Sequence, residues 1–184
     1  MGDSLSYSVS GQPAGISIDS VTSVLSGILA NDASQTNGGV YTIVVTATDT
    51  QGATATDIFN LTVNNLPPIA SNDSDETDED TQFVSNFSVL DNDADQSPDN
   101  DPLTVITPLE IPVAGSNGGE FVFQSNGIFS FDPNGDFEAL AAGATTNTSI
   151  DYTISDGQGN NGTATLTVTV TGVNDAPTTT GLNN

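Results

Sequence analysis

Apolar and polar residues alternate in short stretches along almost the whole chain, which is the pattern of half-buried β-strands. Residues 40–48 and 54–63 alternate in this way, and Phe59, Leu61 and Val63 are expected to face inward in the second stretch. The longest example covers 161–171, where threonines alternate with Ala164, Leu166, Val168 and Val170. No segment has the 3.6-residue period of a long helix. The pattern therefore predicts an all-β protein.

Four phenylalanines predict the geometry of one hairpin. A two-residue Asn-Gly turn at Asn126 and Gly127 would send the phenylalanines of the two strands to opposite faces. A three-residue loop with Gly127 in the left-handed region instead places all of them on one face. Because one face of the hairpin must form the core, the sequence favours the three-residue loop. The expected pairs are Phe121 with Phe131 and Phe123 with Phe129.

A stiff junction separates two units with a similar order of turns and strands. Residues 64–68 read NNLPP, and the two prolines remove backbone donors and interrupt a strand. Each unit ends with an Asp-containing turn, a strand and an Asn-containing junction, which is an internal repeat. We therefore expect two tandem antiparallel β-sandwiches, over residues 1–65 and 66–175, followed by a tail over 176–184.

An acidic loop stands out in the second unit. Residues 91–101 read DNDADQSPDND, and the chain has 24 Asp and Glu residues against no Lys, Arg or His. Carboxylates this crowded raise one another's pKa unless a cation lies between them, and hard oxygen ligands in a flexible loop suit calcium. The alternative is a solvated acidic loop on a salt-adapted surface. The aspartates concerned are Asp91, Asp93, Asp95, Asp99 and Asp101.

Composition excludes several classes of function. Nucleic acids and anionic membranes are bound largely through Lys and Arg, which the chain lacks. It also has no Cys, His or Lys for nucleophilic catalysis. A glycosidase carboxylate pair remains conceivable, but the acidic residues fall in loops between strands. No apolar run approaches the length of a membrane helix. We therefore expect a protein that is not an enzyme.

Two stretches resemble known families. Residues 2–65, with GDSLSYSVSG and GGVYTIVVTATDTQGATATDIFNLTV, resemble the dystroglycan-type cadherin-like domain. Residues 66–175, with VLDNDAD, SNGIFSF, DYTISDGQG and TVTVTGVNDAP, resemble the VCBS or bacterial cadherin-like repeat of giant RTX-type surface adhesins. The resemblance implies Greek-key sandwiches that bind Ca²⁺ at module junctions, in an extracellular or cell-surface protein exported by bacteria.

The resemblance also implies a set of calcium ligands. In the first unit they are Asp49, Asn64 and Asn65. In the second they are Glu79, then Asp91, Asp93 and Asp95 of the acidic loop with Asp99 or Asp101, and finally Asp156, Asn174 and Asp175. One departure concerns the first unit, which lacks the opening strand of the family. The tail, with APTTTGLNN, resembles the first strand of a further module.

Three functions are compatible with these features. The first is a calcium-stiffened extender repeat of a large secreted adhesin, which contacts neighbouring modules of the same chain. The second is a carbohydrate-binding module for surface glycans, although the chain has no Trp and only three Tyr. The third is a filament subunit, in which Thr178–Leu182 of one copy completes the first unit of the next, head to tail.

Overall fold

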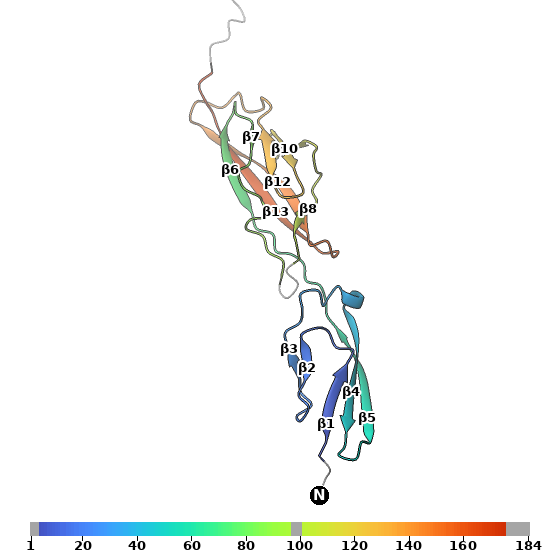
Figure 1. Ribbon diagram of the computed structural model, residues 1–184. Helices are drawn as coiled ribbons and strands as arrows, with labels where there is room; N and C mark the ends of the chain where they lie inside the picture. The colour runs from blue at the N-terminus through green and yellow to red at the C-terminus, as the bar shows by residue number, and fades with distance from the viewer. Residues whose placement is uncertain (1–3, 97–100, 176–184) are drawn as a thin grey trace, which may run out of the picture. The chain divides into compact units, whose positions relative to one another are not determined.

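The computed structural model describes residues 4–96 and 101–175, and these residues form β-strands joined by turns with one short 3-10 helix. Figure 1 labels most of the strands and colours all of them by residue number. The chain divides into two compact units, each described below by itself. Unit 1 comprises Met1–Pro67, Asp95–Pro102 and Gly157–Asn160, and unit 2 comprises Pro68–Ala94, Leu103–Asp156 and Asn161–Asn184. No helix in the described ranges is long and apolar enough to cross a membrane.

Unit 1 contains a three-stranded and a two-stranded antiparallel sheet. The larger sheet has the order β1-β4-β5, and the smaller sheet pairs β2 with β3. The 3-10 helix η1, Thr36–Gly39, leads directly into β4. Tyr41 and Ile43 of β4 are buried, as the alternation predicts. The strands are β1 (Ser6–Ser10), β2 (Ile16–Ile18), β3 (Leu25–Gly27), β4 (Val40–Thr48) and β5 (Thr54–Thr62).

Unit 2 is a sandwich of two four-stranded sheets. One sheet has the order β7-β11-β10-β9 and the other has the order β6-β13-β12-β8. Two long strands, β12 and β13, form the centre of the second sheet and pair over their full length. The strands are β6 (Asp73–Asp78), β7 (Phe83–Val84), β8 (Thr104–Val105), β9 (Val113–Ala114), β10 (Glu120–Phe123), β11 (Phe129–Asp132), β12 (Thr145–Ser155) and β13 (Asn161–Thr171).

One strand of unit 2 departs from the purely antiparallel arrangement predicted from the sequence. The opening strand β6 pairs in parallel with the last strand β13, from Asp73 opposite Leu166 to Asp78 opposite Thr171. Parallel strands cannot be joined by a tight turn, so their partners are far apart in the sequence. Local patterns therefore could not predict this pair. Its consequence is that the outer edge of β13 is covered.

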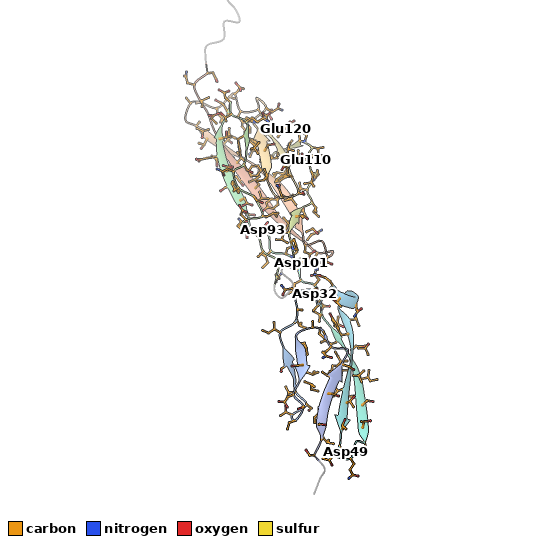
Figure 2. All side chains as sticks on the ribbon, viewed as in Figure 1. Asp32, Asp49, Asp93, Asp101, Glu110 and Glu120 are labelled. Atoms are coloured by element: carbon orange, nitrogen blue, oxygen red, sulfur yellow. The ribbon has the colours of Figure 1, made fainter. Side chains whose placement is uncertain are left out.

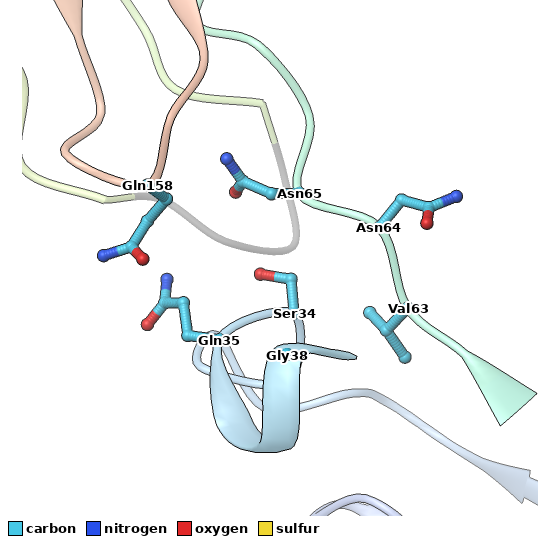
Figure 3. Close-up of a pocket in the computed structure, with 7 residues that line it drawn as sticks. All are labelled: Ser34, Gln35, Gly38, Val63, Asn64, Asn65 and Gln158. Atoms are coloured by element: carbon cyan, nitrogen blue, oxygen red, sulfur yellow. The ribbon is translucent and has the colours of Figure 1, made fainter. Parts of the chain in front are cut away.

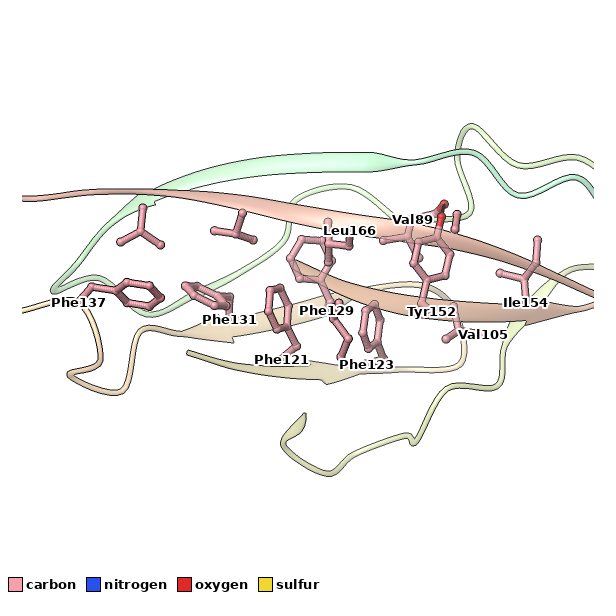
Figure 4. Close-up of a cluster of buried hydrophobic side chains, with 14 residues drawn as sticks. Val89, Val105, Phe121, Phe123, Phe129, Phe131, Phe137, Tyr152, Ile154 and Leu166 are labelled. Atoms are coloured by element: carbon pink, nitrogen blue, oxygen red, sulfur yellow. Dashed lines mark hydrogen bonds between the residues drawn. The ribbon is translucent and has the colours of Figure 1, made fainter. Parts of the chain in front are cut away.

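The core of unit 2 lies between its two sheets and is rich in aromatic residues (Figure 4). The predicted hairpin is confirmed, because Phe121 pairs with Phe131 and Phe123 with Phe129, and Gly127 has a φ of 83°. All of these phenylalanines are buried, and the rings of Phe121 and Phe131 are 4.8 Å apart. The inward row of β13 is buried as predicted. Turn chemistry and the core face together determined this register.

Phe59 does not follow the prediction for unit 1. The alternation along β5 places it inward, but 41% of its surface is exposed. The described part of unit 1 buries few large apolar side chains, chiefly Tyr41 and Ile43. Phe59 is therefore aligned with the core face without enough neighbours to cover it.

Candidate metal centre

The best-defined candidate site lies at one end of unit 2 and is built around Glu79. This residue directly follows β6 and is only 2% exposed. Its N–H donates to the Thr171 carbonyl (3.0 Å), and its Oε1 accepts from the Val173 N–H (2.8 Å). The other carboxylate oxygen, Oε2, is buried and has no hydrogen-bond partner among the described residues. A buried charge in this state is costly unless a cation compensates it.

Three further carboxylates gather beside Glu79. Asp80, Glu138 and Asp175 each offer an oxygen, and these oxygens all lie within 4.8 Å of one another. All three side chains are exposed. They come from three different segments, which follow β6, β11 and β13. The fold thus brings three carboxylates together at one end of the sandwich, and the charge of Glu79 acts on one of them, Glu138.

Glu138 is a member of this group that the sequence analysis did not predict. It lies in the turns after β11, next to Phe137, which is buried in the core. The ring centroids of Phe137 and Phe131 are 6.4 Å apart. The Leu140 N–H donates to the Phe137 carbonyl (2.9 Å), so the turn is held on both sides of Glu138. Glu138 lies close to Asp132 and Asp136 in the sequence, but this segment lacks the dense acidic run that marks the loop over 91–101. Its sequence signals are these two aspartates and the apolar residue beside it.

The electrostatics of this group favour a bound cation. Loss of hydration, followed by the charges of Asp175, Asp80 and Glu79, raises the pKa of the Glu138 carboxyl. The whole sequence contains no Lys, Arg or His that could neutralise the group. Its donors are all hard oxygens, which suit Ca²⁺, whereas Zn²⁺ prefers nitrogen and sulfur ligands. The residues present therefore fit a calcium ion.

A second group of carboxylates in unit 2 surrounds the hydroxyl of Tyr152. This hydroxyl donates to Asp73 Oδ2 (2.7 Å), and the bond lowers the pKa of Asp73. Burial, followed by the charge of Asp91, has the opposite and larger effect, so the pKa of Asp73 is raised. Asp93 Oδ1 accepts from the Ser71 N–H (2.7 Å), while its Oδ2 is buried and has no partner in the described ranges. Burial and the charge of Asp73 raise the pKa of Asp93.

The acidic loop is divided between the two units. Asp91 is exposed and accepts from the Ser88 N–H (3.0 Å), and Asp93 turns toward Asp73. Asp95 and Asp101 belong to unit 1, where the Asp101 N–H donates to Asp95 Oδ2 (2.7 Å). Asp101 also accepts from Gln35 Nε2 (2.6 Å). Asp99 lies outside the described residues.

The remaining predicted ligands belong to both units. Asp49 lies in the β4–β5 turn (Figure 2), where its Oδ1 accepts from the N–H groups of Gln51 and Ala53, both at 2.8 Å. These two hydrogen bonds give Asp49 a structural role in the turn. Asp156 is 3% exposed, whereas Asn174 is exposed next to Asp175 at the end of unit 2.

Asn64 and Asn65 line a polar pocket of about 560 Å³ in unit 1 (Figure 3). Most of the other lining groups are amides, a hydroxyl and backbone, without a carboxylate. Such a lining offers neutral hydrogen-bond donors and acceptors, so it provides less charge for a metal than the group around Glu79. The other lining residues are Ser34, Gln35, Gly38, Val63 and Gln158.

Comparison with known families and structures places these observations in context. The model of the bacterial cadherin-like domain family matches residues 64–172, and an Ig domain model matches residues 1–64. The match over residues 1–64 is thus to an Ig domain, and the dystroglycan type stays a prediction. No curated protein matches the sequence.

Solved cadherin ectodomains are among the similar structures. The chain is 17% identical to mouse cadherin-23 EC22-24 (TM-score 0.38) and covers 94% of its own length and 55% of that chain. For Drosophila N-cadherin EC1-3, the identity is 17%, the TM-score 0.41 and the coverage 94% and 57%. For the protocadherin γB4 extracellular domain, these values are 16%, 0.37, 92% and 26%. The chain thus spans little more than half of the first two structures.

Proposed function

The chain belongs to the bacterial cadherin-like domain family, and from this membership we propose that it is a calcium-stiffened extender module of a large bacterial surface adhesin. In this proposal the module is not catalytic and acts outside the cell. Its partners are the neighbouring modules of the same polypeptide. Calcium is held at the end of unit 2 by Glu79, Asp80, Glu138 and Asp175.

One observation carries the proposal, namely the buried Oε2 of Glu79 without a hydrogen-bond partner in the described chain. Glu79 is 2% exposed and its Oε1 is already used by the Val173 N–H. An ionised carboxylate in this position needs a cation, and the sequence supplies none from its side chains. A bound Ca²⁺ would meet this need and use the three exposed carboxylates as further ligands.

The position of the site explains how calcium would stiffen the module. The ligands follow three different strands, so one ion would tie together three segments that otherwise end at the same edge of the sandwich. Ligands that bind only the folded state raise its stability by mass action. Extracellular calcium modules bind at roughly 0.1 to 1 mM, so cytosolic calcium would leave the site empty.

The direct test compares two charge-matched variants. Glu138→Gln removes one carboxylate from the site, and Glu110→Gln removes one from an exposed position elsewhere in unit 2. We expect calcium at about 1 mM to raise the melting temperature of the wild type and of Glu110→Gln, and to raise that of Glu138→Gln much less. Calorimetric titration should show the same order of affinities. Equal calcium responses in both variants would contradict the assignment.

Glycan binding is a second candidate, and the amide-rich pocket of unit 1 is the observation that favours it. Gln35, Asn64 and Gln158 offer the paired donors and acceptors that sugar hydroxyls use. The pocket lacks an aromatic side chain on which a sugar ring could stack. A glycan array with and without calcium, repeated with Gln35→Ala, would test this candidate. Binding that this variant leaves unchanged would contradict it.

A further inference from the structure

The strands β6 and β13 of unit 2 are neighbours that run in the same direction (Figure 1). Six residue pairs join them, from Asp73 opposite Leu166 to Asp78 opposite Thr171. The chain therefore enters this β6–β13 ladder at one end, beside Asp73, and leaves it at the other end, beside Thr171. Tension along the polypeptide would pull the two strands past each other, along their own axes.

The direction of this load decides how the ladder resists it. The hydrogen bonds of a parallel pair are evenly spaced and run across the gap between the strands. When the strands are pulled past each other, these bonds carry the load together and must fail together. When the strands are peeled apart sideways, the bonds carry the load one after another and fail singly. Tension on the polypeptide loads the β6–β13 ladder in the first way.

Two side chains prolong the ladder beyond the ends of β6. Before the strand, Asn72 Oδ1 accepts from the Thr165 N–H (2.9 Å). After the strand, the Glu79 N–H donates to the Thr171 carbonyl (3.0 Å), and Glu79 Oε1 accepts from the Val173 N–H (2.8 Å). Asn72 and Glu79 thus fasten the two ends of the ladder, which are the places where peeling would begin.

Within this pair, β6 is the strand that is held less firmly. β13 is also paired with β12 over its full length, and its Leu166, Val168 and Val170 are fully buried. β6 has the sequence DSDETD, contains no apolar residue and is the outermost strand of its sheet in the described residues. It is therefore attached chiefly by hydrogen bonds rather than by apolar contacts, so the ladder sets the resistance of unit 2 to tension.

We propose that the β6–β13 ladder is a force-bearing clamp that keeps unit 2 folded when the polypeptide is stretched, with Asn72 and Glu79 as its end clasps. The clamp does not rest on the proposed calcium site, because Glu79 Oε1 holds the Val173 N–H whether or not Oε2 binds an ion. Forced unfolding is governed by the unfolding rate. The clamp therefore acts through the lifetime of the fold under load, whereas calcium acts on its equilibrium stability.

Two pulling geometries on the full chain test the clamp. The sequence has no Cys, so pairs of introduced cysteines define the points at which optical tweezers pull. Leu66→Cys with Asn174→Cys loads the ladder along its strands. Ser74→Cys with Thr167→Cys pulls two paired residues apart sideways. Both geometries release roughly 30 nm of chain, at about 3.5 Å per residue.

The lifetimes of unit 2 at one constant force are compared in excess chelator. We expect the lengthwise geometry to unfold at least about tenfold more slowly than the sideways geometry, because several bonds must fail together. Equal lifetimes, or a shorter lifetime in the lengthwise geometry, would overturn the clamp. The chelator keeps this result separate from the calcium proposal, which is tested by adding the ion.

Two uncharged variants test the clasp at Glu79. Glu79→Gln keeps an acceptor for the Val173 N–H, whereas Glu79→Leu fills a similar space without one. In the lengthwise geometry we expect Glu79→Leu to unfold several-fold faster than Glu79→Gln, and in the sideways geometry we expect equal lifetimes. Asn72→Ala should shorten the lifetime in the same selective way at the other end of the ladder. A change of equal size in both geometries would show that these residues stabilise the fold without fastening the ladder, and would overturn their role as clasps.

Discussion

The two units bury their apolar residues very differently. Unit 2 has two four-stranded sheets around a continuous core that includes seven phenylalanines and Tyr152 wholly or partly buried. Unit 1 has sheets of three and two strands, and 41% of Phe59 is exposed. Strands with the same alternating pattern thus give a closed core in one unit and an open cleft in the other. The difference shows that alternation orients side chains, whereas neighbouring strands decide whether they are buried.

The largest expected effect is on the core of unit 2. Phe131→Ala removes a 0% exposed ring that contacts Phe121 and Phe137, so we expect a loss of about 3 to 5 kcal/mol in unfolding free energy. Phe59→Ala in unit 1 should cost about 1 kcal/mol or less, because the ring is already partly in water. Hydrogen exchange of β12–β13 and of β4–β5 measures the two effects separately. Equal losses would show that the Phe59 ring is packed as tightly as the Phe131 ring.

The effect of Glu79→Gln on the stability of unit 2 should have opposite signs with and without calcium. Glu79→Gln eliminates an uncompensated carboxylate, so in excess chelator we expect unit 2 to become more stable. The same change removes a central ligand, so the stabilisation by calcium, about 2.7 kcal/mol at a hundredfold excess over Kd, should be mostly lost. Denaturant titrations in both conditions provide the measurement. Destabilisation of equal size in both would indicate a purely structural role for Glu79.

Without calcium, the stability of unit 2 should change with pH by less than it changes in the two experiments above. The direction of this change tests the raised pKa values of Asp73 and Asp93. Burial raises the pKa of Asp73 and Asp93 in the folded protein, so the folded state binds protons more tightly than the unfolded state does. Stability from these groups is therefore full below the unfolded pKa of about 3.9 and is lost as the pH rises through the folded pKa. We expect melting temperatures in chelator to rise as neutral solutions are made mildly acidic.

One variant and one series with calcium separate the effect of the Asp73 charge from other effects of acid on stability. Asp73→Asn keeps an acceptor for the Tyr152 hydroxyl and removes the charge, so it should flatten the rise on acidification. With calcium present, acid protonates the ligands and releases the ion, so melting temperatures should fall instead. A fall on mild acidification in chelator as well would contradict the raised pKa values.

The smallest expected effect concerns the turn of unit 1. Asp49→Ala removes an acceptor for two backbone N–H groups, so we expect a loss of about 1 kcal/mol, the same with and without calcium. Asp49→Ser retains an acceptor oxygen and serves as the control. Thermal melts of both variants with calcium and with chelator suffice. A loss that appears only with calcium would identify Asp49 as a metal ligand.

Predictions from the sequence were best where local chemistry and the core face acted together. The Phe121–Phe131 hairpin was correct because a left-handed Gly127 and the need for one apolar face leave a single register. The predicted ligand set stays a prediction, although the charges of two of its members, Glu79 and Asp175, both act on Glu138. Glu138 was not in that set, because it reaches this place only through the turn that Phe137 anchors.

By itself, the sequence determined that this protein is built of β-strands and that it has no basic side chain to pair with its 24 carboxylates. The alternation of apolar and polar residues is a local property, and composition is a sum over all residues. Both can therefore be obtained from the sequence without the structure. Only the tertiary structure decided which carboxylates meet, that β6 runs parallel to β13, and that the edge of β5 is open in the described residues. These are contacts between distant segments, and their free energy depends on how the sheets close, which no local pattern contains.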